Sequence, residues 1–243
     1  MTLSKVSAKD RLIVALDVPT MEEALALVDE LQEDVGVFKV GLELFSSCGV
    51  ALLTELARRG VPVFFDGKFH DIPNTVASAS RAIVSHQVKM FNVHAQGGSA
   101  MMKAACEAAR NAAPHGLKPI VIAVTVLTSI SEEILEGELG MSRPLEATVE
   151  RLAVLAKSSG LDGVVASAKE VPAIRRALGD DFVIVTPGIR PEWAAADDQK
   201  RIVTPGQAME LGSDYIVVGR PITRAADKRD AARRIVEEME AVR

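Results

Sequence analysis

FFDGKFHDIPNT, residues 64–75, is the stretch that decides the fold, because it joins a strand to a helix through a charged loop. The β-branched run at 61–63 predicts the strand, and the run at 76–84 predicts the helix. Strand side chains alternate between faces, so Asp66 and Lys68 are expected to point the same way. Asp71 follows in the loop. A lysine between two carboxylates is held charged and is suited to donate a proton; the alternative is a structural ion pair at a strand end.

Strands and helices alternate on both sides of this stretch, which forms the third strand. Apolar runs predict further strands at 11–17, 37–41, 88–94, 119–125, 163–166, 182–186 and 215–218. Helical spacing is predicted at 20–31, 50–59, 97–113, 144–159 and 227–242. This pattern predicts a single-domain (β/α)8 TIM barrel over residues 1–243, with a polar N-terminal extension at 1–10. A doubly wound open sheet is disfavoured, because no Gly-x-Gly-x-x-Gly follows the first strand.

Composition limits the possible partners. The 243 residues are 48% hydrophobic, which is enough for a sizeable core, and the formal net charge is −5. No basic tract indicates nucleic acid or an anionic membrane, so an anionic substrate needs local positive charge. The polar N-terminus and the lack of a long apolar run predict no signal peptide and no membrane span. Cys48 and Cys106 are expected to be reduced thiols, as is typical of a cytoplasmic protein.

Polar and charged side chains lie at the ends of the predicted strands. They are Asp17, Lys39, Asp66, Lys68, His94, Thr128 and Arg220. Charged groups that close apolar strands are costly to bury unless they are paired. Barrel enzymes carry their chemistry at the carboxyl ends of the strands, so these positions predict an active site.

Gly219-Arg220 follows the last predicted strand. Barrels often bind phosphate with the loops after strands seven and eight, and the guanidinium fork of Arg220 matches phosphate oxygens. A solvated surface arginine is the alternative. The loop at 186–201 after strand seven is long for a compact domain, which is typical of a binding loop or lid.

The pattern Asp66-x-Lys68-x-x-Asp71-Ile72-x-x-Thr75 resembles the signature of the orotidine 5′-phosphate decarboxylase family. The resemblance covers nearly the whole chain, from 14–17 to 219–221. It implies cofactor-independent decarboxylation of orotidine 5′-phosphate to UMP in de novo pyrimidine synthesis, without a metal. It also implies a homodimer with shared active sites. Gly67 departs from the family, where a bulkier residue such as Leu is common, and we expect a difference of packing only.

By this resemblance, Lys68 stabilises and protonates the carbanion at C6 of the pyrimidine, while Asp66 and Asp71 hold it in place. Lys39 bridges Asp66 and the ribose, and Asp17 accepts from a ribose hydroxyl. The proton transfer is general acid catalysis by a positioned ammonium group. These five residues make up the predicted charge network.

The resemblance also implies a partner contribution and further substrate-binding residues. Asp71 and Thr75 lie on a loop that reaches into the partner's site. Thr128 or Ser129 contacts the pyrimidine edge, although a helix-capping pair is an equally good interpretation. His94 is expected to be structural. The remaining substrate-binding positions are Arg190, Gln199, Gly219 and Arg220.

Two other functions stay open on the sequence. One is a sugar-phosphate decarboxylase or aldolase on a related barrel, such as 3-keto-gulonate-6-phosphate decarboxylase. Those enzymes use Mg²⁺ and carry a carboxylate where this chain has Lys39. The other is a catalytically silent nucleotide-binding barrel acting as a sensor, against which the intact Asp66, Lys68, Asp71 and Lys39 argue.

Overall fold

The computed structural model describes residues 6–114, 116–194 and 203–242. Eight parallel strands close into a barrel in sequence order, and β1 pairs with β8. The predicted TIM barrel is therefore confirmed, and the open sheet is wrong. The strands are β1 (Leu12–Ala15), β2 (Val37–Val40), β3 (Val63–Phe69), β4 (Met90–His94), β5 (Ile120–Val124), β6 (Gly163–Val165), β7 (Val183–Thr186) and β8 (Tyr215–Val218).

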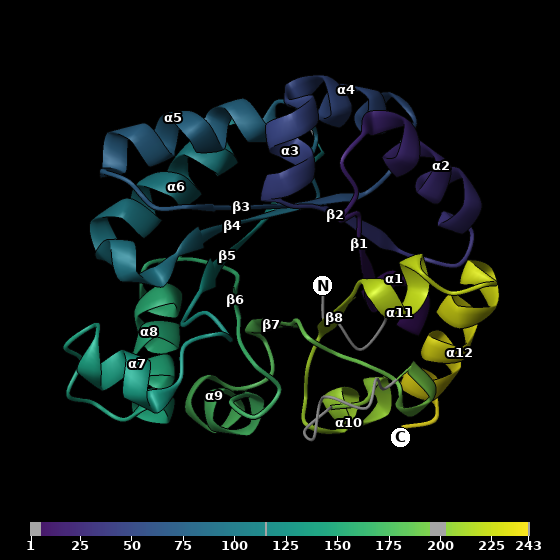
Figure 1. Ribbon diagram of the computed structural model, residues 1–243. Helices are drawn as coiled ribbons and strands as arrows, with labels where there is room; N and C mark the ends of the chain where they lie inside the picture. Colours follow the sequence, from purple (N-terminus) through teal and green to yellow (C-terminus); the bar gives the residue numbers. More distant parts are fainter. Residues whose placement is uncertain (1–5, 115, 195–202, 243) are drawn as a thin grey trace.

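The longer helices surround the strands (Figure 1). They are α2 (Met21–Leu31), α4 (Val50–Arg58), α5 (Pro73–Val84), α6 (Gly98–Ala112), α8 (Leu145–Ser158), α9 (Val171–Leu178) and α12 (Lys228–Glu240). Their apolar faces form the main core against the outer face of the barrel. In α2 the buried residues are Ala24, Leu27, Val28 and Leu31, at the helical spacing that the sequence predicts.

Sequence reasoning missed α9 and the shorter helices, because four to eight residues are too few to show a clear helical period. The shorter ones are α1 (Ala8–Arg11), α3 (Leu42–Cys48), α7 (Glu132–Gly137), α10 (Pro205–Glu210) and α11 (Arg220–Thr223). Several predicted boundaries also differ by one or more residues, and two of them matter for the site and the barrel end. Arg11 ends α1 and does not begin β1, and α5 starts at Pro73, whose fixed φ suits the first helical position.

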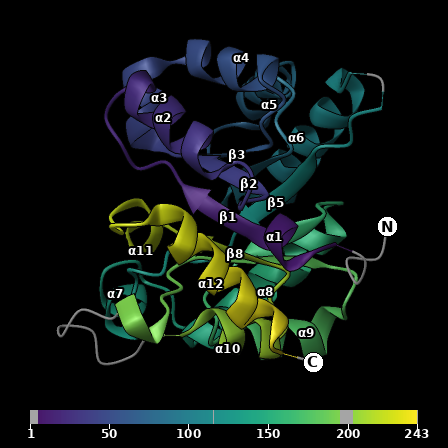
Figure 2. The same cartoon turned by 90° about the vertical axis from the view of Figure 1, so that its right-hand side faces the viewer.

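The helix α1 covers the N-terminal end of the barrel beside α12 (Figure 2). The guanidinium of Arg11 donates to the backbone carbonyls of Asp214 at 2.7 Å and Ser213 at 2.8 Å. The described part of the predicted extension at 1–10 is thus packed on the barrel. Nowhere in the described part of the chain is a helix long and apolar enough to cross a membrane.

The inside of the barrel determines where the site lies. Alternate strand residues point inward and form a second, smaller apolar cluster that includes Val37, Phe64 and Met90. Two residues further along β2, β3 and β4, the inward positions are Lys39, Asp66 and Asn92. The apolar interior therefore gives way to charged and polar side chains at the carboxyl ends of these strands.

Candidate active site

The strand β3 is irregular where it carries the key charged residues. It continues to Phe69, and its register against β4 shifts between Phe65 and Phe69. Within this bulge Lys68 has a φ of 50°, in the left-handed region that residues other than glycine rarely adopt. The regular alternation of strand side chains therefore does not describe Asp66 and Lys68. The bulge brings the Lys68 Nζ to 2.7 Å from the Asp66 Oδ1.

Gly67 lies between them, and its packing explains why no side chain stands there. A Cβ atom at this position would overlap the ring of Phe65. That ring is buried and packs edge-on against Phe45, with 4.8 Å between the ring centroids. The phenylalanine on the same face of the strand thus fills the space that a larger residue 67 would need, which accounts for the departure as a difference of packing.

Four side chains of alternating charge form a continuous network at the barrel mouth. The Lys39 Nζ lies 3.1 Å from the Asp17 Oδ1 and 3.6 Å from the Asp66 Oδ2, so it bridges the two carboxylates. Asp66 in turn pairs with Lys68. The Lys39 and Asp66 side chains are largely buried, whereas the side chain of Asp17 is 59% exposed. Buried charges are tolerated when they are paired in this way, and here the pairs leave the Lys68 ammonium at the edge of a cavity.

That cavity has a volume of about 220 Å³. Lys39, Asp66 and Lys68 line one part of it, and Thr128 and Leu127 line it from the loop after β5. The remaining lining residues are Phe64, Val124, Val126, Val165, Ala166, Pro187 and Val217. A small pocket with apolar walls and a few convergent polar groups is typical of a small-molecule site.

A second cavity of about 340 Å³ lies at the loops after β7 and β8. Arg190, Arg220 and Arg224 line it, together with Trp193. Three guanidinium groups around one opening make it suited to a phosphate or another multivalent anion. Gly219 directly precedes Arg220, whereas the predicted binding residue Gln199 lies outside the described residues.

Comparison with known proteins indicates the family to which a chain with these two cavities belongs. Residues 10–235 match the model of the "Orotidine 5′-phosphate decarboxylase / HUMPS" family. The chain belongs to the orotidine 5′-phosphate decarboxylase family. A Heliobacterium modesticaldum protein named orotidine 5′-phosphate decarboxylase is 53% identical over 234 residues, which cover 96% of each chain. A Syntrophotalea carbinolica protein of the same name is 54% identical over 97% of each chain.

The fold agrees with this membership. The crystal structure of orotidine 5′-phosphate decarboxylase from Lactobacillus acidophilus superposes with a TM-score of 0.85 at 41% identity. The match covers 94% of this chain and 98% of that one. Family membership makes the chain an enzyme of the carboxy-lyase class.

For an orotidine 5′-phosphate decarboxylase family member, the position of Asp71 is informative. Sequence reasoning placed Lys68 between two carboxylates, but within the described part of this chain the Lys68 ammonium pairs with Asp66 alone. Asp71 is exposed, and its Oδ1 accepts from the backbone N–H of Ile72 at 2.6 Å. Thr75 is likewise exposed, in the first turn of α5. Both residues thus face solvent in a single copy of the chain.

Sequence reasoning missed three residues that the fold brings to the site. Asn92 forms hydrogen bonds with both Asp66 and Lys68. Arg224 lines the 340 Å³ cavity together with Arg190 and Arg220, and we call this the arginine cavity. His70 stacks on His94, with the ring centroids 5.3 Å apart. Burial, followed by the positive charges of His70 and Lys68, lowers the pKa of His94, which favours a neutral ring. Of the three missed residues, Asn92 leaves a signal in the sequence: it is a polar residue on the inward face of an apolar strand.

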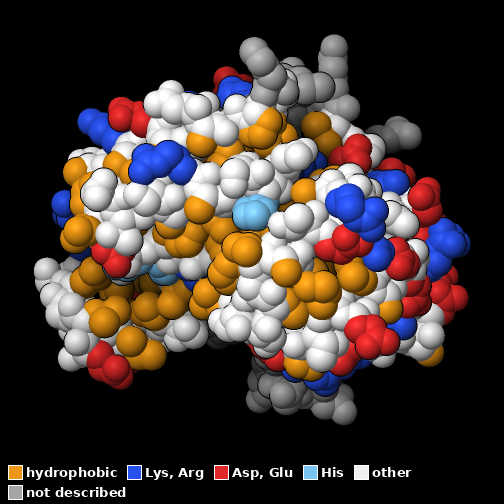
Figure 3. All heavy atoms as spheres, turned by 90° about the horizontal axis from the view of Figure 1, so that it is seen from above, with side chains coloured by type: hydrophobic (Ala, Val, Ile, Leu, Met, Phe, Trp, Pro, Cys, Tyr) orange, Lys and Arg blue, Asp and Glu red, His pale blue; other side chains and the backbone are white. Residues whose placement is uncertain are grey.

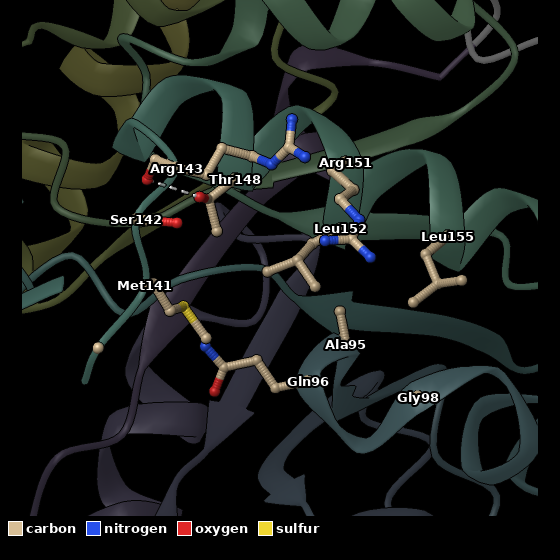
Figure 4. Close-up of a pocket in the computed structure, with 11 residues that line it drawn as sticks. Ala95, Gln96, Gly98, Met141, Ser142, Arg143, Thr148, Arg151, Leu152 and Leu155 are labelled. Carbon is tan, nitrogen blue, oxygen red and sulfur yellow. Dashed lines mark hydrogen bonds between the residues drawn. The ribbon is translucent and has the colours of Figure 1, made fainter. Parts of the chain in front are cut away.

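Another cavity, of about 680 Å³, lies elsewhere (Figure 4). The turn Ala95–Gly97 and α8 form its sides, and Arg143 and Arg151 are its charged lining residues. It has neither a lysine nor a carboxylate among its lining residues, so it offers no proton donor of the kind found at Lys68. Among the described residues there is also no cluster of three or more His, Cys, Asp or Glu side chains that could hold a metal ion.

Proposed function

We propose that this chain decarboxylates orotidine 5′-phosphate to UMP, with Lys68 as the proton donor and without a metal or organic cofactor. Family membership supports the reaction. One observation supports the mechanism: the Lys68 ammonium lies 2.7 Å from Asp66 at the edge of a small, mostly apolar cavity. In the proposed step the bond from C6 to the carboxylate breaks, CO₂ leaves, and the electron pair stays on C6. A proton from Lys68 then forms the new C6–H bond.

The apolar walls increase the effect of the charges. Electrostatic interactions are stronger where water is excluded, so a fixed ammonium group stabilises the developing carbanion better than solvent does. Asp66 holds Lys68 and also places negative charge near the departing carboxylate. Lys39 and Asp17 are assigned to the ribose, and Thr128 to the edge of the pyrimidine.

The arginine cavity is the proposed phosphate site. Arg190 and Arg220 line it, and Gly219 and Gln199 complete the proposed set. A chain with a net charge of −5 attracts a phosphorylated substrate only through such a local concentration of positive charge. Binding energy from the non-reacting phosphate is then available to assemble the charged site around the pyrimidine.

The test of this function is turnover of orotidine 5′-phosphate by the wild type, by Lys68→Ala and by the control Lys103→Ala, which changes an exposed lysine on α6. Lys68→Ala should lose about 10²–10⁴-fold or more in kcat, with an unchanged circular dichroism spectrum. Lys103→Ala should match the wild type. Substantial turnover by a folded Lys68→Ala variant would refute the assignment of Lys68 as the proton donor. Activity lost to a chelator and restored by Mg²⁺ would favour the metal-dependent sugar-phosphate enzymes instead.

We further propose that the chain works as a homodimer with shared active sites, in which Asp71 and Thr75 of one copy complete the site of the other. The exposure of Asp71, directly before an Ile72 that is 66% exposed, supports this. Leu42 and Val50 are also more than half exposed on the neighbouring α3 and α4. Seen from above the view of Figure 1, exposed hydrophobic side chains lie in several groups, and acidic and basic side chains are most numerous at one edge (Figure 3).

The proposed location is the cytoplasm. Cys48 is half-buried, Cys106 is buried, and neither forms a disulfide. Unpaired thiols are typical of a reducing compartment, and the cytoplasm is such a compartment.

A further inference from the structure

We propose that Asn92 is a positioning residue that holds Asp66 and Lys68 in their working arrangement; this rests on the function proposed above. Asn92 lies on β4 and is 1% exposed. Its Nδ2 donates to the Asp66 Oδ1 at 2.7 Å, and its Oδ1 accepts from the Lys68 backbone N–H at 2.8 Å. A single buried amide thus holds the side chain of one charged residue and the backbone of the other.

The two partners fix the orientation of the amide. A backbone N–H can only donate, and an ionised carboxylate can only accept. The oxygen of Asn92 must therefore face Lys68, and the nitrogen must face Asp66. The Asp66 Oδ1 receives two donors, the Asn92 amide and the Lys68 ammonium at 2.7 Å, which leaves its Oδ2 facing Lys39 at 3.6 Å.

The backbone of Lys68 needs this support. Its φ of 50° is a conformation that costs free energy and persists only where the surroundings enforce it. The register shift between Phe65 and Phe69 interrupts the β3–β4 ladder at this point. The amide oxygen of Asn92 supplies the acceptor for the Lys68 N–H, and in doing so it stabilises the bulge that brings the ammonium to Asp66.

The position of Asn92 predicts whether its loss changes kcat or KM. Asp66 and Lys68 are among the described residues that line the 220 Å³ cavity, and Asn92 is not. The amide therefore acts through its neighbours and has no contact with a bound ring. A misplaced Lys68 slows proton transfer while the pocket still binds, so loss of Asn92 should lower kcat and leave KM nearly unchanged.

The test compares Asn92→Leu, which keeps the branching and the number of side-chain heavy atoms and loses both bonds, with Asn92→Asp. The control Thr125→Val removes another buried polar group, a hydroxyl that donates to the carbonyl of Val165. Asn92→Leu should lose about 100-fold in kcat with KM within about threefold, and Thr125→Val should keep the wild-type kcat. The Tm and the circular dichroism spectrum establish that each variant is folded.

The pH dependence of kcat for Asn92→Asp distinguishes a positioning role from a merely structural one. An ionised carboxylate at position 92 repels Asp66, whereas a protonated carboxyl group there can donate to Asp66 as the amide does. The kcat of Asn92→Asp relative to wild type should therefore rise as the pH falls from about 8 to about 6, and that of Asn92→Leu should not.

Three results would overturn the assignment: a folded Asn92→Leu with normal kcat, a loss confined to KM, or parallel pH profiles for all variants. Lys68→Ala, measured alongside, separates failure of this inference from failure of the proposed function. An active Lys68→Ala refutes the proposed function itself, whereas an inactive Lys68→Ala beside a fully active Asn92→Leu refutes only the positioning role.

Discussion

At the residue scale, Gly67 shows how a departure from a family pattern becomes understandable once packing is known. The ring of Phe65 occupies the place of a Cβ at residue 67, and it also packs against Phe69, with 5.7 Å between the centroids. Residues 65 and 67 therefore share one space, and a change at either affects both.

The variant Gly67→Ala should lower the free energy of unfolding by about 1–3 kcal/mol, because the added methyl group is forced against a buried ring. The measurement is urea unfolding. Gly137→Ala is the matched control, since a Cβ there meets open space and the residue lies in a helix. The double variant Phe65→Leu/Gly67→Ala should recover part of the loss. If Gly67→Ala is as stable as the control, the two residues do not share the space.

At the element scale, a second polar cluster ties the N-terminal end of the barrel together. Arg175 on α9 donates to the Asp214 Oδ2 at 2.6 Å, and Asp214 also accepts from the backbone N–H of Ile184 in β7. The same guanidinium donates to backbone carbonyls of the neighbouring loops, those of Gly179, Phe182 and Gly212. Burial raises the pKa of Asp214 although Arg175 opposes this, so the carboxylate depends on its donors.

The variant Arg175→Met should lower the free energy of unfolding by about 3 kcal/mol, because it leaves the largely buried Asp214 without its charged partner. Its kcat/KM should stay within about twofold of wild type, since the cluster lies at the end of the barrel opposite the charge network. Chemical unfolding and steady-state kinetics give the two values. The control is Arg176→Met, an exposed neighbour on the same helix. A large loss of activity at full stability would contradict this division between the two ends.

At the scale of the whole molecule, the barrel mouth combines two sites that we propose bind different parts of one substrate. The charge network comes from β1, β2 and β3, and the arginine cavity comes from the loops after β7 and β8. Because β8 pairs with β1, the closed barrel makes these distant segments neighbours. In the proposed function, binding energy from the phosphate can therefore contribute to the reaction at the pyrimidine.

The variant Arg220→Ala should lower kcat/KM for orotidine 5′-phosphate by about 10- to 100-fold, as expected for the loss of a hydrogen bond to a charged group. For orotidine, which lacks the phosphate, the change should stay within about threefold. Steady-state kinetics with both substrates provides the comparison. Arg143→Ala, in the 680 Å³ cavity, should alter neither value. Equal losses for both substrates would assign Arg220 a role other than phosphate binding.

The shared site is tested by subunit exchange between two inactive variants, Lys68→Ala and Asp71→Asn. A mixed dimer has one site with both defects and one with neither, if Asp71 serves the partner's site. Equal amounts give about half mixed dimers, so about one quarter of all sites become wild type under twofold symmetry. Activity should rise from near zero toward that fraction. Verified exchange without recovery would place Asp71 in the site of its own chain.

The sequence by itself determined the architecture and the family. The alternation of apolar strands with helical segments is a local property, set by side-chain period, and it predicted all eight strands to within a few residues. The motif from Asp66 to Thr75 is contiguous, so it too could be recognised without a structure. Lys39 and Arg220 were found because each lies in or next to an apolar strand run whose end is visible in the sequence.

Only the tertiary structure decided how these residues meet. The bulge at Lys68 depends on the pairing of β3 with β4, and the bonds of Asn92 join positions 24 and 26 residues apart in the chain. The gathering of Arg190, Arg220 and Arg224 around one cavity likewise depends on the closed barrel. Such contacts depend on strand register and loop path, which are fixed by the packing of the whole chain and leave no local pattern in the sequence.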